Sequence, residues 1–392
     1  MKAFAAKRVL TGADLELMED ACVLVEGDQI IRILPRQEFL AEQPADCQLT
    51  DLGDVTLMPG MIECHNHLAL DARLPGHLEM MGESECLHTI LALNGLKDDL
   101  MSGVTTARCL GDRNYIDVEL KKQIRQGRVV GPDLLVCGIG MKSLHGHGYV
   151  GMPHSGVEEM RRTARENMFR GVDVLKIFVT PGAPVGPGEF IPCFLSYDEI
   201  RTVVEEAHAM NIRTAAHCIG GKGLDYCVKA GVDVIEHVYS ITPEQVELVA
   251  KEHKGWVDLT SGIVLDPDRE PFCPKPFVEN LHRVREYSRQ CMTAVVQCPD
   301  IRWTLGTDAN HGLLYREAQY ACEMGATPLQ AVKGLTSAAA VMCGIEGKTG
   351  ALQSGLRADV IAVEGNPLED VSALSRVSFV MKAGTVYKHE SK

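Results

Sequence analysis

The chain has 392 residues, of which 45% are hydrophobic and 23% are charged, as is typical of a globular protein with a large buried core. Lys and Arg number 39 against 53 Asp and Glu, which gives a formal net charge of -14. Because phosphate binding needs a basic surface, this balance excludes nucleic acid as an expected partner.

The two ends of the chain share one pattern. Residues 1 to about 55 and the tail from about 350 contain short runs of alternating apolar residues separated by turn residues, which predict strands. Neither end holds enough apolar residues to form a core alone. We therefore expect residues 1–56 and 350–392 to form one small β-sandwich domain, which a larger domain at 57–349 interrupts in sequence.

The middle of the chain repeats a unit in which a helical segment ends near glycine and an apolar, β-branched strand follows. Gly103, Gly171 and Gly231 occupy that position, where glycine supplies the left-handed conformation of a helix cap. Between the strands lie amphipathic segments, and residues 197–209 have the apolar spacing of a helix. Eight strands are predicted in this way: 61–67, 104–108, 134–138, 172–179, 212–217, 232–237, 256–260 and 301–307.

Strands that alternate with helices predict a fold of the α/β class, and eight of them predict a parallel (β/α)₈ barrel, or TIM barrel. The alternative is a doubly wound open sheet. That fold usually carries a glycine-rich dinucleotide fingerprint after its first strand, and no such fingerprint follows residue 67 here.

Polar side chains that can bind metal lie in or at the ends of these strands. His65 and His67 end the first strand, and because side chains alternate along a strand, both point to one face. Alone, an H-x-H pair is commonly two surface histidines. Four further candidates occupy comparable positions on other strands, and the catalytic sites of (β/α)₈ barrels lie at the carboxyl ends of their strands. They are Lys176, His217, His237 and Asp308.

These residues stand in recognisable motifs: P-G-M-I-E-C-H-N-H at 59–67, D-V-L-K-I at 173–177, A-A-H, I-E-H and G-T-D at the three later strand ends, and A-D-V-I near the tail. With them the chain resembles the amidohydrolase superfamily of metal-dependent hydrolases over nearly its whole length. Within that superfamily it resembles most the branch of Xaa-Pro dipeptidases, ochratoxin-type amidases and imidazolonepropionase-like enzymes.

The resemblance implies two divalent metal ions, expected to be zinc, and a carboxylated Lys176 that bridges them. His65, His67 and Asp308 would hold one ion, and His217 with His237 the other. Asp308 would also transfer the proton from the attacking water to the leaving nitrogen. Burial lowers the pKa of a lysine and leaves the neutral amine that carbon dioxide attacks, which fits this role for Lys176.

The residues that contact substrate are predicted less narrowly. The third strand is followed by S-L-H-G-H-G, and the resemblance implies that a histidine there contacts the substrate carbonyl. His147 is preferred to His145, because its G-H-G setting is closer to the family pattern. Tyr239 matches a position where relatives bind a substrate carboxylate, although a packing role is as good an interpretation. The Pro-rich segment 266–276 is expected to form part of a lid or of the pocket rim.

The chain departs from its relatives beside the pocket. Relatives commonly read V-R-D-x-G after the second strand, whereas this chain has Arg108, Cys109, Leu110, Gly111 and Asp112. The sixth-strand motif usually ends E-H-G, and here valine follows His237. A dipeptide substrate therefore does not follow from the motifs.

The sequence thus predicts a metal-dependent amidohydrolase that cleaves a C–N bond in an amide, dipeptide, carbamate or urea-like small molecule. A cyclic amidohydrolase or deaminase acting on a ring is the alternative, and a non-catalytic metal-binding scaffold is a third hypothesis. No apolar run approaches the roughly 20 residues of a membrane span, and no export signal is evident. With 14 scattered cysteines, these features predict a cytoplasmic protein, and the resemblance implies a homo-oligomer.

Overall fold

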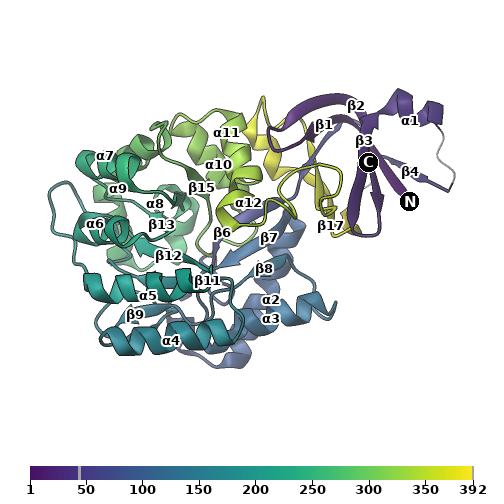
Figure 1. The fold of residues 1–392 in the computed structure, drawn as a ribbon. Coiled ribbons are helices and arrows are strands. Elements are labelled where there is room, and N and C mark those ends of the chain that lie inside the picture. Colours follow the sequence, from purple (N-terminus) through teal and green to yellow (C-terminus); the bar gives the residue numbers. More distant parts are fainter. Residues whose placement is uncertain (43–45, 391–392) are drawn as a thin grey trace.

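A barrel of eight parallel strands forms the middle of the chain in the computed structural model, which describes residues 1–42 and 46–390 (Figure 1). Its strands are β6 (Met61–Asn66), β7 (Val104–Cys109), β8 (Asp133–Leu135), β11 (Val174–Phe178), β12 (Arg213–Cys218), β13 (Val234–His237), β14 (Trp256–Leu259) and β15 (Trp303–Leu305). They form two hydrogen-bonded arcs, β6-β7-β8 and β11-β12-β13-β14-β15, every pair in them is parallel, and the last strand contacts the first. The predicted barrel is therefore confirmed. Two short strands, β9 (Met141–Ser143) and β10 (Met152–His154), follow β8.

Helices surround the barrel and cover its apolar strands (Figure 1). The α-helices are α2 (Glu85–Met101), α3 (Ile116–Arg125), α4 (Val157–Phe169), α5 (Tyr197–Ala209), α6 (Gly221–Ala230), α7 (Pro243–Glu252), α8 (Gly262–Leu265), α9 (Lys275–Val296), α10 (Leu314–Glu323), α11 (Pro328–Gly334) and α12 (Ser337–Cys343). Three 3₁₀ segments join them, η1 (Glu79–Gly82), η2 (Arg113–Tyr115) and η3 (Pro267–Phe272).

Helix α5 shows how the sequence sets these elements. Ser196 and Glu199 form a reciprocal capping box at its start, which satisfies backbone N–H groups that have no partner within the helix. The apolar side chains predicted for its inner face are buried. The glycines predicted to end helices before strands, at 103, 171 and 231, all have positive φ.

The small domain contains both chain ends (Figure 1). Its strands form one mixed hydrogen-bonded path in the order β18-β17-β16-β5-β1-β2-β3, and β4 pairs with β1. Phe4 and Phe379 lie on strands that two others separate in this order, yet their ring centroids are 5.2 Å apart, so the path curls over a shared core. The predicted β-sandwich from the two termini is confirmed. Its strands are β1 (Lys2–Thr11), β2 (Glu16–Glu26), β3 (Gln29–Pro35), β4 (Gln48–Asp51), β5 (Val55–Pro59), β16 (Val360–Glu364), β17 (Val377–Lys382) and β18 (Thr385–His389), with helices α1 (Arg36–Glu42) and η4 (Val371–Ser375).

The chain crosses from the small domain into the barrel at Gly60. A Cβ there would overlap the Thr105 side chain, so glycine is needed for the close approach of β5 and β6 to β7. Strand β5 extends three residues past the predicted boundary at 56, and the division into 1–56, 57–349 and 350–392 stays a prediction. None of the described helices is both long enough and apolar enough to span a membrane.

Candidate metal centre and substrate cavity

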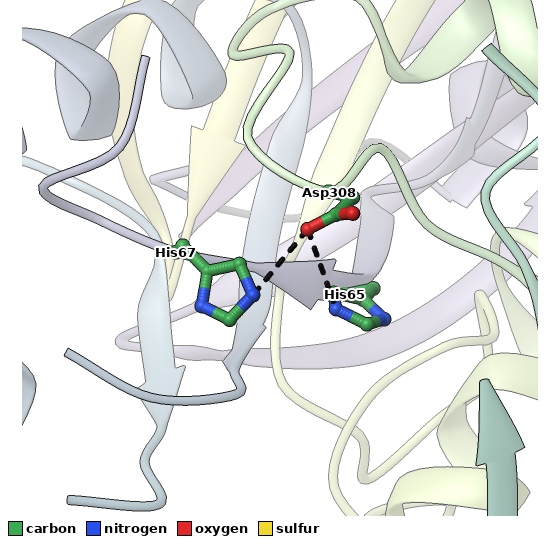
Figure 2. Close-up of side chains that lie close together, drawn as sticks. All are labelled: His65, His67 and Asp308. Atoms are coloured by element: carbon green, nitrogen blue, oxygen red, sulfur yellow. Dashed lines mark ion pairs between the residues drawn. The ribbon is translucent and has the colours of Figure 1, made fainter. Parts of the chain in front are cut away.

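Three predicted ligands meet at the carboxyl ends of the first and last barrel strands. The Asp308 Oδ1 atom lies 3.5 Å from His65 Nε2 and 3.3 Å from His67 Nε2 (Figure 2). One ligand atom from each residue falls within 4.8 Å of the other two. Both imidazole rings are buried, and the Asp308 side chain retains 22% exposure. One carboxylate oxygen thus faces two imidazole nitrogens, which is a donor set that zinc accepts.

The second ring nitrogen of each of these histidines is held by another group. His65 Nδ1 lies 2.8 Å from the buried carboxylate of Glu236, which also pairs with Arg108 at 2.9 Å. His67 Nδ1 donates to the Gly111 carbonyl at 2.8 Å. In both rings the proton therefore belongs on Nδ1, and the Nε2 lone pair faces Asp308. His65 Nε2 is buried without a hydrogen-bond partner among the described residues, as a ligand atom would be.

The other two predicted histidine ligands are oriented in the same way. His217 Nε2 donates to the Pro181 carbonyl at 2.9 Å, which leaves Nδ1 free. His237 Nδ1 lies 2.7 Å from the Thr260 hydroxyl, and the Tyr239 hydroxyl contacts that hydroxyl and donates to the Thr260 carbonyl at 3.0 Å. This series of hydrogen bonds places a proton on His237 Nδ1 and leaves its Nε2 free.

The histidine rings form a continuous cluster. The ring centroids of His217 and His237 are 4.4 Å apart, those of His65 and His237 are 4.8 Å apart, and those of His65 and His67 are 5.3 Å apart. The structure thus brings together all four predicted histidine ligands and Asp308. We call these five residues the floor of the site.

Lys176 lies on β11 beside the floor and is fully buried. Its Nζ atom has no hydrogen-bond partner among the described residues and lies 5.2 Å from the Phe178 ring centroid. Burial lowers the pKa of this amine below its usual value. A buried, unpartnered amine is costly in a protein interior, and covalent capture by carbon dioxide would turn it into an anionic oxygen ligand.

The pKa values of the floor residues favour the protonation states that bind cations. Burial, followed by the charge of Lys176, lowers the pKa of His65 to about 4. Burial also lowers the pKa values of His217 and His237 well below the usual value, so all three rings are neutral near pH 7. Burial opposes ionisation of Asp308, but His65 and His67 outweigh it and hold the Asp308 pKa well below its usual range.

Strain in the backbone aims two of these side chains. His237 has φ of 81° and Asp308 has φ of 52°, values that non-glycine residues rarely adopt. Regular strand alternation would turn His237 away from the barrel axis, since Glu236 already points inward to Arg108. The left-handed turn at the strand end lets consecutive residues both serve the site, as such strain does at functional sites.

Several residues that the sequence interpretation did not select support the floor. Glu63 accepts backbone N–H groups from His65 at 2.8 Å and Thr307 at 2.9 Å, which joins the ends of β6 and β15. A Cβ at Gly306 would lie 2.5 Å from the His65 backbone nitrogen, so the glycine of the G-T-D motif allows this close approach. Asp112 accepts from the backbone N–H groups of Leu68 and Ala69 and holds the loop after β6.

A second group of possible ligand atoms, from His65, Glu236 and Asp258, lies deeper in the barrel. Arg108 already balances the Glu236 carboxylate, and Asp258 accepts from the Thr304 hydroxyl at 2.6 Å. Burial opposes ionisation of Glu236, yet Arg108 and His65 bring its pKa to about 2, whereas burial raises that of Asp258 well above its usual value. We interpret this group as the support of His65.

A cavity of about 360 Å³ opens above the floor. Apolar side chains form most of its lining, among them Leu78, Ile263 and Phe277. The predicted rim segment 266–276 contributes Arg269, Cys273, Pro274 and Pro276 to it, which confirms that prediction. The size and the mostly apolar lining suit a small organic molecule.

The two candidate histidines after β8 are placed differently. His147 lines the cavity, with its ring centroid 4.6 Å from that of His217, and it has no hydrogen-bond partner in the described part of the chain. A Cβ at Gly182 would overlap the His147 ring, so glycine makes room for it. His145 is exposed, bonds to Ser143 and does not line the cavity. Burial lowers the pKa of His147 to about 4, so its ring is neutral near pH 7.

Tyr239 also lines the cavity, but its hydroxyl proton is used by the Thr260 carbonyl. In this arrangement Tyr239 orients His237. Its contact with a substrate carboxylate stays a prediction, and it would require that hydrogen bond to break.

The residues present fit divalent metal ions. Four imidazoles each present a free nitrogen, one ionised carboxylate faces two of them, and a buried amine beside them has no hydrogen-bond partner among the described residues. Nitrogen and oxygen donors with oriented second partners are the usual environment of zinc in proteins.

Known proteins resemble the chain over most of its length. A sequence model described as "Amidohydrolase family" matches residues 56–387. The ochratoxinase of Aspergillus niger is 29% identical over 424 aligned residues, which cover 97% of this chain and 85% of that protein.

Solved structures show the same fold. A prolidase complexed with N-methylphosphonate-L-proline superposes with a TM-score of 0.86 at 24% identity, covering 99% of this chain and 100% of that one. A Xaa-Pro dipeptidase with bound methionine superposes with a TM-score of 0.84 at 24% identity, covering 99% of each chain.

Proposed function

The chain belongs to the amidohydrolase family and is a hydrolase of carbon–nitrogen bonds, and from this premise we propose that it is a binuclear metal-dependent enzyme. Its substrate would be an acyclic amide, dipeptide, carbamate or urea. The observation that carries the proposal is the orientation of the four floor histidines, each of which has one ring nitrogen held by a neighbour and the other free.

We assign one ion to His65, His67 and Asp308 and the other to His217 and His237, with carboxylated Lys176 between them. When bound, two divalent ions, which we propose to be zinc, would supply an activated water and polarise the scissile carbonyl. The fully buried Lys176 amine, which has no hydrogen-bond partner among the described residues, supports the binuclear assignment. Its conversion to a carbamate would give the side chain a negative charge, and the two metal ions would be its partners.

Asp308 performs the proton transfer in this proposal. Its carboxylate is the ionised group of the floor and is partly exposed to the cavity, so it can accept a proton from the attacking water. The same carboxylate then delivers that proton to the leaving nitrogen, which must be protonated before the C–N bond breaks.

His147 binds the substrate carbonyl oxygen in this proposal. A neutral imidazole carries one N–H donor, and the His147 ring lies in the cavity beside His217 without a hydrogen-bond partner among the residues that the structure describes. A donor at this position stabilises the negative charge that develops on oxygen during attack. His145, which is exposed and bonded to Ser143, has no such position.

The experiment that tests the proposal joins a metal assay with a substrate panel. We expect two divalent ions per chain after gentle purification, and hydrolysis of N-acyl amino acids, Xaa-Pro dipeptides, aryl amides or ureas that stops when a chelator removes the metal. Activity on lactams or imidazolones alone would support the ring-opening alternative. A chain that binds no metal and hydrolyses nothing would support the scaffold hypothesis.

A further inference from the structure

One charged residue in the cavity has no role in the proposed chemistry. Arg269 lies in η3 (Pro267–Phe272), between β14 and α9, and is 7% exposed. Among the described residues that line the cavity, it is the only arginine or lysine. It shares this cavity with His65, His67 and Asp308. We call the part of the lining from η3 to the start of α9 the wall, and the apolar residues beside Arg269 there are Cys273, Pro274, Pro276 and Phe277.

The acidic residues nearest to Arg269 in sequence are paired with other cations. Arg316 binds both Asp266 and Asp268, while Arg285 and His282 bind Glu270. These ion pairs lie away from the cavity lining. No carboxylate of the described residues forms an ion pair with Arg269, although three acids stand within three positions of it.

The hydrogen bonds of Arg269 are also incomplete. Its Nη1 atom donates to the Ile263 carbonyl, which fixes the guanidinium against α8. Its Nε atom is buried without a partner among the described residues. A buried guanidinium that lacks both an anion and a full set of acceptors is unfavourable, so its retention in a cavity indicates that a ligand supplies what is missing.

The ligand can be narrowed by its charge. His77, which also lines the cavity, adds no positive charge, because burial and the neighbouring Arg269 lower its pKa and keep its ring neutral. One guanidinium with a free Nε edge matches a single carboxylate, which accepts two parallel N–H bonds. A neutral carbamate or urea would leave Arg269 unpaired.

We propose that Arg269 is a specificity-determining residue that binds a carboxylate of the substrate. The enzyme would then act on amides that carry a carboxylate near the scissile bond, such as N-acyl amino acids and dipeptides, in preference to neutral amides, carbamates and ureas. This inference rests on the proposed hydrolytic function and narrows its substrate class.

The test compares matched substrates on the metal-loaded enzyme. N-benzoyl-L-phenylalanine and N-benzoyl-phenethylamine contain the same kind of scissile amide, but only the first has a carboxylate, and an Ala-Pro dipeptide pairs in the same way with alanyl-pyrrolidide. We expect kcat/KM of wild type to favour the acid of each pair by about 10–100-fold, as hydrogen bonds to charged groups allow. In Arg269→Met that ratio should fall toward one, while Arg269→Lys should retain part of it.

Arg285→Met is the matched control, because Arg285 lies in the same region, pairs with Glu270 and does not line the cavity. It should keep the wild-type ratio. Equal use of acid and neutral partner by wild type, or a ratio that Arg269→Met leaves unchanged, would overturn the proposal.

A binding measurement separates this inference from the proposed hydrolysis. We expect 3-phenylpropionate to stabilise the metal-loaded wild type against heat more than 3-phenylpropanamide does, and expect Arg269→Met to lose the difference. If that difference is present but no amide is hydrolysed, the carboxylate site stands and the hydrolytic function is wrong. If hydrolysis occurs without the difference, the carboxylate site is wrong.

Discussion

The floor of the cavity presents groups that suit cations, whereas its wall presents a cationic side chain, Arg269. On the floor, each of the four histidines has a neighbour that fixes its tautomer, from Glu236 behind His65 to Thr260 behind His237. On the wall, Arg269 has one carbonyl partner and no acidic partner among the described residues, while the acids beside it in sequence pair with other cations. In the proposed function the floor lacks only its cations, and the wall lacks only an anion.

This difference separates chemistry from specificity. Groups whose orientation the protein fixes in advance can act on any substrate that presents a carbonyl above them. A buried charge left unpaired gains most from a ligand that brings the opposite charge, and thus selects among substrates. The floor should therefore control kcat and metal content, whereas the wall should control the choice of substrate.

Loss of the floor carboxylate should give the largest effect. In Asp308→Asn, the group that accepts and returns the proton is absent, and we expect kcat to fall by about 10²–10⁴-fold. Steady-state kinetics at saturating zinc, with thermal unfolding as a check on the fold, measures this. Near-normal turnover in the variant would remove Asp308 from the mechanism.

Lys176 should follow in size, because it is proposed to supply the ligand shared by both ions. In Lys176→Ala we expect the metal content to drop below that of wild type and kcat to fall on the order of 10²-fold or more. Added propionate should restore part of the activity, since a free carboxylate can enter the space that alanine leaves. Lys176→Met fills that space and should not respond, and equal rescue of both variants would argue against a bridging anion.

A smaller effect is expected for the residue behind His65. Glu236→Gln removes the charge that holds His65 Nδ1 and leaves the Arg108 guanidinium without its anion, so metal affinity should fall about 10–100-fold. Competition with a chromophoric chelator measures it. Asp258→Asn is the control, because Asp258 lies 3.9 Å from the same nitrogen, beyond hydrogen-bond distance, whereas Glu236 lies 2.8 Å from it. Similar losses of metal affinity in both variants would show that the loss of any buried carboxylate weakens metal binding, and that the contact to His65 is not the cause.

The sequence predicted the floor much better than the wall, for a physical reason. Floor residues end strands of a repeated unit, and because all such ends meet at one rim, His217 and Asp308 could be placed together without knowing any contact. Glu236 was missed because alternation allows only one inward residue of two, and the positive φ of His237 breaks that rule. Arg269 stands in an irregular segment, where no periodicity shows which side chain turns inward.

Tertiary pairing was also beyond the reach of the sequence. The segment 266–270 contains three acids and one arginine, a composition that predicts local ion pairs. In the structure Arg316, on α10, and Arg285, on α9, bind those acids and so free Arg269. Tyr239 shows the same limit, since its hydroxyl is bonded to Thr260, a partner 21 residues away in the chain.

The smallest expected effect concerns a pair beneath the floor. Asp99 accepts from Asn66, the residue between His65 and His67, and from the buried ring of His311 at 2.9 Å, whose other nitrogen lies 3.2 Å from the Leu70 carbonyl. Burial disfavours the charged ring, but Asp99 overrides it and raises the pKa of His311 to about 9. Both ring nitrogens face acceptors, as a protonated imidazole requires.

This pKa determines how stability should depend on pH. An unfolded histidine has a pKa of about 6.5, so the folded state binds the extra proton and its contribution is complete below that pH. The contribution is then lost as pH rises through about 9. Thermal unfolding of wild type and His311→Gln between pH 6 and 10 should show a gap in stability that closes with rising pH. A gap that stays constant would mean that His311 is neutral in the folded protein and supports the floor by packing alone.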